Sequence, residues 1–390
     1  MFVAVIPLVL AAIVAVPMTA GAAKSAITVG VLNETSGEFG AQFGPVQAGA
    51  TAWADWENAH GGVGGHHINL KTYNNDSSPS EAVSNAHLAA AQGAVALIDS
   101  DPLFDSYAPY LHSLDMPVYA FGITPGFYGA TNNSFFSYSG DIADGKSDAA
   151  IKFYVQQFHK TKFALISDPS PADSEDIGAD IPVVKAVGGT VVYSNLSVDP
   201  TNTADLLSVA QAIKASGAQV VISAAGGNEA EDQVDLAQVG AGNIWVSNGS
   251  NYEQNLPQQY GSALDNFTFF FFTAPFTVPT TGMKDYLAAM KKYEPSEEYN
   301  FNALVGWTSG ELLAGGVAEL GSKAVTRQSL TNATNKLTNY TGDGVMAPVT
   351  FPIMHTQTTR CLAFVQVQHG KWVQISGTKT SPFYCTNGLS

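Results

Sequence analysis

One segment of the sequence satisfies the pattern of a phosphate-binding loop, G-x-x-x-x-G-K-S, between Gly140 and Ser147. In such a loop the backbone amides cradle phosphates, the lysine neutralises their charge and the serine coordinates magnesium. Here Asp141 and Asp144 would stand inside the loop and repel a phosphate. The sequence therefore favours another role, in which Lys146 is a solvated residue of a helical first turn and no nucleotide is bound.

Three further patterns could belong to catalytic or metal sites, but none is complete. Gly306–Gly310 (GWTSG) approaches a nucleophile elbow, yet Thr308 takes the central position and the segment has a helical pattern. His66 and His67 are adjacent, so on a strand they would point apart, and we expect both on an exposed loop. The acidic segment Asp168–Asp180 lacks the spacing of a calcium loop and is interpreted as a solvated loop. The sequence thus predicts no catalytic residue, no metal site and no cofactor.

Binding is better supported, because a glycine-bearing loop follows the first predicted strand. The strand Ile27–Leu32 leads into the polar loop Thr35–Gly37 and then into a predicted helix, Pro45–Asn58. The proline in the first helical turn and the pair Gly61-Gly62 after the last turn are start and stop signals. In open parallel sheets, ligands bind at the loops that follow the strands.

The rest of the chain alternates strand-like and helix-like segments, which indicates a parallel sheet covered by helices. The tail Val345–Ile375 returns to strands, with a hairpin turn at Gln366–Gly370. Four consecutive phenylalanines within Phe267–Phe272 are interpreted as a buried central strand rather than a membrane contact. The other predicted strands are Thr28–Leu32, Ile68–Tyr73, Ala94–Ile98, Pro117–Ala120, Phe163–Ser167, Thr190–Ser194, Val220–Ser223 and Asn243–Ser247. The other predicted helices are Pro79–Gln92, Ala149–Phe158, Asp205–Ala215, Glu229–Val239, Met283–Tyr293 and Phe301–Leu320.

Length and charge limit the class of protein. A chain of 390 residues is long enough for two domains, and a hydrophobic content of 45% indicates a packed globule. The net charge of −16 excludes nucleic acid and anionic membrane as favoured partners, because like charges repel.

The first residues have the features of a signal peptide, which we place at residues 1–25. An apolar run, Phe2–Met18, contains two prolines and is followed by the small residues Ala20–Ala22. No lysine or arginine precedes the run, which leaves open a start upstream of Met1. No cysteine lies near the cleavage site, so a lipoprotein anchor is not expected, and the mature protein is predicted to be secreted beyond the cytoplasmic membrane.

The two cysteines, Cys361 and Cys385, both lie in the last 30 residues of the chain. In an exported protein such a local pair predicts a disulfide. Closing a loop of this length stabilises the fold by about 3 to 4 kcal/mol in the chain-entropy model.

Residues 27–76 closely resemble the amino-terminal signature of the extracellular solute-binding proteins of the Leu/Ile/Val-binding family, and the resemblance extends from Ile27 to Gly377. It implies the type I periplasmic-binding fold, an α/β fold in which two Rossmann-like lobes with parallel sheets are joined by three crossover hinge segments. Lobe I would comprise residues 26–140 and 274–347, and lobe II residues 141–273 and 348–390. The crossings are expected at Ser139–Asp141, Thr273–Pro275 and Met346–Pro348.

The resemblance also implies a ligand site between the lobes. Gly122-Ile123-Thr124 stands where the family offers backbone groups and a hydroxyl to the ligand. Phe43 and Trp307 match aromatic residues that close over the ligand, although both could be ordinary core residues. The expected ligand-binding residues are Phe43, Ser100, Asp101, Phe104, Gly122, Ile123, Thr124, Asp173, Asn248 and Trp307.

Three segments depart from the family's pattern and leave the ligand open. Asp99–Asp105 replaces a serine-rich loop that grips a carboxylate, and Asp168–Asp173 replaces an aspartate–tyrosine–glycine segment. The second-lobe acid that pairs with an α-ammonium group is missing within Val246–Ser250. A buried ammonium without this partner would cost several kcal/mol, on the order of the desolvation of one ion. A free branched-chain amino acid is therefore disfavoured, and an apolar or aromatic compound, an amide or another carboxylate is left open.

The sequence thus predicts a binding protein that captures a small organic solute and delivers it to the membrane permease of an ATP-driven importer. A sensing receptor ectodomain on the same fold and a hydrolase that uses the cleft are the alternatives. No helix-turn-helix segment precedes the fold, which argues against the DNA-binding relatives of this architecture.

Overall fold

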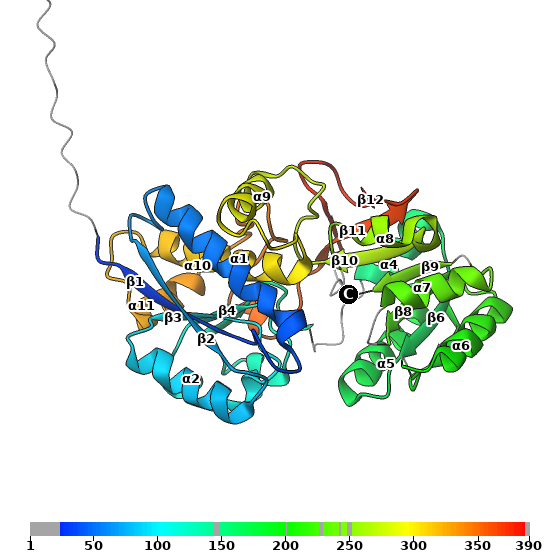
Figure 1. Cartoon of the computed structure of the whole chain (residues 1–390), viewed down its shortest axis with the longest axis horizontal. Coiled ribbons are helices and arrows are strands. Elements are labelled where there is room, and N and C mark those ends of the chain that lie inside the picture. Colours follow the sequence, from blue (N-terminus) through cyan, green and yellow to red (C-terminus); the bar gives the residue numbers. More distant parts are fainter. Residues whose placement is uncertain are drawn as a thin grey trace, which may run out of the picture.

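The protein's structure, a computed structural model, describes residues 24–142, 149–199, 201–225, 229–241, 243–247 and 252–386. Two lobes lie side by side and are joined near the middle of the molecule (Figure 1). The predicted signal peptide, apart from Lys24 and Ser25, lies outside the described residues. No helix within these ranges has the length and apolarity needed to cross a bilayer.

The first lobe is built on a parallel sheet with the strand order β2-β1-β3-β4-β5. Its strands are β1 (Ile27–Asn33), β2 (Ile68–Asn74), β3 (Ala96–Asp99), β4 (Val118–Ala120) and β5 (Phe135–Ser137). Helices α1 and α10 pack together on one face, and α2 with the short η1 covers the other. The helical segments are α1 (Gly40–Ala59), α2 (Pro79–Ala91), η1 (Phe104–Ser106), α3 (Ala108–Ser113), η2 (Pro125–Phe127), α9 (Thr281–Tyr293), α10 (Phe301–Leu320), α11 (Arg327–Thr334) and η5 (Ile353–His355).

The second lobe contains a larger sheet, in which β6 to β10 are parallel and β11 to β13 are added antiparallel. Strand β10 lies between β9 and β11, and Phe267, Phe269 and Phe271 are all buried, which confirms the interpretation of the phenylalanine run. The strands are β6 (Lys162–Ser167), β7 (Thr190–Asn195), β8 (Val220–Ala224), β9 (Ile244–Ser247), β10 (Phe267–Phe271), β11 (Cys361–Gln368), β12 (Lys371–Gln374) and β13 (Phe383–Cys385). The helical segments are α4 (Ala149–Phe158), α5 (Pro171–Ala186), α6 (Thr203–Ser216), α7 (Glu229–Gln238), α8 (Leu256–Tyr260) and η4 (Gly261–Leu264).

The predicted fold class is confirmed, but some local predictions are wrong. His66, expected on an exposed loop with His67, is only 6% exposed, and its Nδ1 lies 2.7 Å from the Ser25 carbonyl oxygen. The first helix begins at Gly40, so Pro45 lies inside it rather than in its first turn. The acidic segment predicted as a solvated loop forms helix α5 from Pro171 onward. Ser170 caps this helix, because its hydroxyl accepts a hydrogen bond from the Asp173 backbone N–H at 3.2 Å.

The GWTSG segment is explained by helix packing rather than by chemistry. Helix α10 contains it, and Gly306 faces α1 so closely that an added Cβ would lie 2.0 Å from the Val46 carbonyl oxygen. From the other side, a Cβ on Gly49 would lie 1.7 Å from the Ala303 carbonyl oxygen. The two backbones are therefore in direct contact, and only glycine fits at these positions.

Extended segments connect the lobes and pair with one another. The Thr359 N–H donates to the Ser139 carbonyl at 2.7 Å, next to the first predicted crossing. The Ala347 N–H donates to the Phe272 carbonyl, also at 2.7 Å, next to the second. Paired segments of this kind can bend together while the lobes stay rigid, which is the geometry of a hinge.

The third crossing, predicted at Met346–Pro348, lies further along the chain. After this segment the chain still packs on the first lobe, where Phe351 and His355 contact the ring of Phe136 at centroid distances of 5.1 and 5.3 Å. It leaves that lobe near Thr358, which forms an isolated bridge with Gly140. The predicted boundary at residue 347 is therefore too early, because a buried apolar residue keeps the following loop on lobe I.

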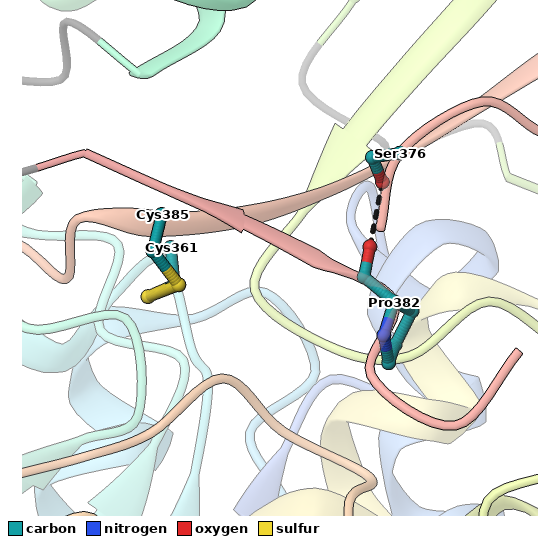
Figure 2. Close-up of a disulfide and its surroundings, with 4 residues drawn as sticks. All are labelled: Cys361, Ser376, Pro382 and Cys385. Atoms are coloured by element: carbon teal, nitrogen blue, oxygen red, sulfur yellow. Dashed lines mark hydrogen bonds between the residues drawn. A yellow bond between two sulfur atoms is a disulfide. The ribbon is translucent and has the colours of Figure 1, made fainter. Parts of the chain in front are cut away.

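The carboxyl-terminal strand is tied to its neighbour by the two cysteines. Cys361 of β11 lies opposite Cys385 of β13, and a disulfide joins them (Figure 2). At the other end of β13 the Ser376 hydroxyl donates to the Pro382 carbonyl at 2.6 Å (Figure 2). The strand is thus fixed at both ends.

Candidate functional site

The carboxyl ends of the two sheets are turned toward the connection between the lobes. Strand β5 runs directly into the first crossing, and its parallel neighbours in the first lobe end at the same edge. Strand β10 runs into the second crossing in the same way, and its parallel neighbours β9, β8 and β6 share its direction. The loops after the strands of both lobes are therefore gathered near the hinge, where this type of sheet binds ligands (Figure 1).

The loop after β4 holds the most suggestive polar group of the first lobe. The Thr124 hydroxyl oxygen is buried and has no hydrogen-bond partner within the described residues. Gly122 is different, because its N–H donates to the Ser137 hydroxyl at 3.2 Å and its carbonyl accepts from the Tyr128 hydroxyl. Ile123 is half-buried. Of this predicted trio, Thr124 has the unsatisfied hydrogen-bonding capacity, whereas both backbone groups of Gly122 are already engaged.

The loop after β3 points into the lobe. The Asp101 carboxylate accepts hydrogen bonds from Asn75, from the Leu103 backbone at 2.7 Å and from the Tyr107 hydroxyl at 3.2 Å. Phe104 is 2% exposed and packs on neighbouring aromatic rings. The prediction that Asp101 and Phe104 contact a ligand is therefore not supported, because their side chains are occupied in the core.

Ser100, in the same loop, is also buried, with 4% of its surface exposed. Its hydroxyl accepts a hydrogen bond from the Phe121 N–H at 3.2 Å, so it joins the β3 loop to the β4 loop. It positions the loop that carries Thr124.

Beneath these loops lies a cluster of three buried carboxyl groups, contributed by Glu34, Asp99 and Asp101. The Tyr107 hydroxyl donates to Asp99 at 2.8 Å, and the Ser77 N–H donates to Glu34. Burial raises the pKa of Glu34 to about 7, and the neighbouring Asp101 adds to this. Burial and Asp101 also raise the pKa of Asp99 well above its usual range. The cluster therefore holds protons at neutral pH.

We predict that this cluster makes stability fall as the pH rises. A carboxyl whose folded pKa is raised stabilises the fold fully below its unfolded pKa, near 4.5, and this contribution is lost as the pH passes about 7. Glu34→Gln should therefore be more stable than the wild type at pH 8, by about 1 to 3 kcal/mol, and the difference should shrink toward pH 5. Urea unfolding of both proteins at pH 5, 6, 7 and 8 measures this.

The matched control is Glu38→Gln, in the same loop but exposed, which should change stability by less than about 0.5 kcal/mol at any pH. His355 acts in the opposite sense, because burial lowers its pKa to about 4, so its contribution is lost as the pH falls. For that reason the difference between Glu34→Gln and wild type is the informative quantity. A difference that stays constant with pH would contradict the prediction.

The two aromatic residues predicted to contact the ligand differ in burial. Phe43 lies in the second turn of α1, is half-buried and packs edge-to-face on Phe39 at 6.5 Å. Trp307 is fully buried in α10, with its ring 5.7 Å from Tyr286. Trp307 is thus a core residue and not a ligand wall, whereas Phe43 retains accessible surface near the first loop.

Of the two ligand-binding residues predicted in the second lobe, only Asp173 lies within the described residues. Asp173 is half-buried in the first turn of α5, where the Ser170 hydroxyl donates to it at 2.8 Å and burial raises its pKa. The hydrogen bond from Ser170 occupies part of the carboxylate. Asn248 lies outside the described residues, and so does the segment 143–148 of the phosphate-loop-like motif.

Sequence reasoning missed one polar group and one ring at these edges. Ser167, the last residue of β6, is fully buried, and its hydroxyl oxygen finds no partner in the described part of the chain. Phe121 follows β4 and is half-buried. Both lie at the carboxyl end of a predicted strand, and that position is the signal that could have identified them.

The described charged residues in the loops at the carboxyl edges of the two sheets are acidic. Within the described ranges, the loops that follow β1 to β8 and β10 contain no lysine or arginine, while Glu38, Asp76, Asp141, Asp168 and Asp199 lie in them. The described residues of these loops therefore offer a bound anion only neutral donors. The described residues also contain no group of three or more His, Cys, Asp or Glu side chains that could hold a metal ion.

This arrangement defines a two-lobe binding protein, and the comparisons agree. The chain belongs to the periplasmic binding protein family, whose model matches residues 26–371. The resemblance drawn from the sequence is thereby confirmed. No functionally curated protein matches the chain.

Solved structures of the same fold cover nearly the whole chain at low identity. A leucine-binding protein from Thermotoga maritima is 16% identical with a TM-score of 0.70, and the match covers 90% of this chain and 98% of that one. A solute-binding protein from R. palustris in complex with benzoate is 17% identical, with a TM-score of 0.69 and coverage of 93% and 99%. A branched-chain amino acid transporter protein from Thermus thermophilus with bound valine is 15% identical, with a TM-score of 0.73 and coverage of 93% and 97%.

Proposed function

We propose that the protein captures a small organic solute between its lobes and delivers it to the membrane permease of an ATP-driven importer. The observation that carries the proposal is the convergence of both carboxyl edges on the hinge, with the hydroxyls of Thr124 and Ser167 unpaired among the described residues. Buried hydroxyls without partners are costly in a finished core, but they are useful where a ligand supplies the missing hydrogen bond. Membership of the periplasmic binding protein family supports the same function.

The described loops narrow the class of solute that we propose as the ligand. Amino acids, amides and apolar or aromatic carboxylates all suit a cleft of this fold, and similar structures hold valine or benzoate. The described edge loops offer neutral donors and carboxylates, which suit an amide or another uncharged solute.

The protein acts outside the cytoplasm in this proposal. Residues 1–25 direct export and are removed, and the disulfide between Cys361 and Cys385 forms in the oxidising compartment. The mature chain then meets its solute before the permease does.

A thermal-shift screen of the mature protein over amino acids, amides, aromatic acids and short peptides tests the proposal. A solute present at about 100 times its dissociation constant should add roughly 2.7 kcal/mol of stability. Thr124→Ala should weaken binding of that solute by about five- to tenfold, the effect of losing one hydrogen bond, without lowering the stability of the unliganded protein.

Thr338→Ala is the control, because this threonine is exposed in a loop of the first lobe near α11. It should leave the ligand-induced shift unchanged. If no solute stabilises the wild type, solute capture is wrong. If Thr124→Ala unfolds more easily without ligand, its hydroxyl is structural.

A further inference from the structure

Four aromatic rings meet where the lobes join. Phe121, from the loop after β4, lies 5.8 Å from Tyr138 and 5.8 Å from Phe272, measured between ring centroids. Its ring also meets Phe301 at 5.6 Å, with the planes at 87°. Tyr138 precedes the first crossing, Phe272 precedes the second, and Phe301 begins α10. The cluster therefore sits at the base of the hinge, between the chain's first two passages from lobe to lobe.

Phe121 is the one member of this group with appreciable accessible surface. Tyr138 is 0% exposed, Phe272 7% and Phe301 5%, whereas Phe121 is half-buried. Its partners hold the ring in one orientation, and its backbone N–H is fixed by Ser100. A ring held in this way loses little conformational freedom when a second ring stacks on it, so binding there costs less entropy.

The cluster is also connected to the second lobe away from the crossings. The N–H of Phe301 donates to the Tyr252 carbonyl at 2.8 Å, and the Gln254 N–H donates to the Tyr299 carbonyl at 3.0 Å. The Tyr252 ring in turn packs on Phe271 of β10 at 4.7 Å. Both lobes thus contact the cluster.

We propose that Phe121 forms the apolar floor of the solute site and stacks against a planar, ring-bearing part of the solute. This inference rests on the proposed function and narrows its ligand class to compounds that carry an aromatic or similarly flat apolar group. Neighbouring Thr124, three residues along the same loop, then supplies a hydrogen bond to the polar end of the same molecule. The apolar face of such a solute would contact Phe121, and its one polar group would bind Thr124.

The test compares four probes on the full mature protein by calorimetry: benzamide, benzoate, L-phenylalanine and L-leucine. At least one ring-bearing probe should bind, and L-leucine should bind more weakly than that probe. Phe121→Leu keeps the apolar volume but removes the planar ring, so it should weaken the ring-bearing probe by about tenfold, the upper range for an aromatic pair, and leave L-leucine within about twofold. Phe158→Leu, a partly exposed ring at the end of α4, is the control and should change neither.

Stability of the unliganded variant separates folding from recognition. Phe121→Leu should melt within a few degrees of the wild type, because its volume is nearly conserved. If a wider screen finds a solute without any planar group, and Phe121→Leu binds it as well as the wild type does, this inference is overturned while solute capture stands. If no solute binds the wild type, the proposed function and this inference fail together.

Discussion

Gly49→Ala and Gly306→Ala are each expected to destabilise the protein by more than about 4 kcal/mol, enough to prevent recovery of folded protein. An alanine Cβ at either position would lie 1.7 or 2.0 Å from a carbonyl oxygen of the facing helix. Backbone atoms cannot rotate out of the way as a side chain can, so α1 and α10 would have to move apart. That movement would disturb the shared core that includes Trp53 and Trp307.

The matched control is Gly178→Ala, in the middle of α5. A Cβ there would lie 3.8 Å from a Leu196 methyl group, an ordinary contact. Because alanine is a better helix former, this substitution should stabilise the protein by up to about 1 kcal/mol. Urea unfolding of the three variants measures both effects. Similar stabilities for Gly49→Ala and Gly178→Ala would show that the two helices tolerate separation.

The sequence predicts this architecture well because the central parallel strands are buried on both faces. Continuous apolar runs such as Phe163–Ser167 and Val220–Ser223 can be recognised without knowing their partners, and both are strands in the structure. Helix α5 was not predicted, because its sequence has almost no helical periodicity of apolar residues. Its acidic first half resembles a solvated loop. The capping residue Ser170 and the proline that follows it are nevertheless recognisable signals for the start of a helix.

The candidate site was predictable as a set of loops but not as a set of side chains. The ends of the strands fix where the loops lie, so the segment after β4 could be identified from the pattern alone. Which side chain in a loop turns inward depends on distant partners. Asp101 turns inward because Asn75 and Tyr107, from other elements, satisfy its carboxylate. Trp307 is buried because α9 supplies Tyr286. None of these three partners is apparent from sequence spacing.

Removing the disulfide with Cys361→Ser and Cys385→Ser is expected to cost about 3 to 4 kcal/mol of unfolding free energy. The two cysteines are separated by 24 residues, and the loop between them contains β12 and the turn that leads into β13. Strand β13 has three residues and pairs only with β11 within the described residues, so few other contacts replace the bond. Tyr384 of β13 packs on Phe153 of α4 at 5.2 Å, and loosening of the strand would expose this side of the second lobe.

The same loss should follow when a reductant is added to the wild type, and the double-serine variant should not respond to the reductant at all. The bond lies near the hinge, because Ala363 of β11 pairs with Phe271 at the carboxyl end of β10, so solute affinity should be measured in both proteins as well. Guanidinium unfolding with and without reductant measures the stability. Mass spectrometry of the exported protein after thiol alkylation counts free cysteines. Two free thiols in that protein, or equal unfolding midpoints, would contradict a stabilising disulfide.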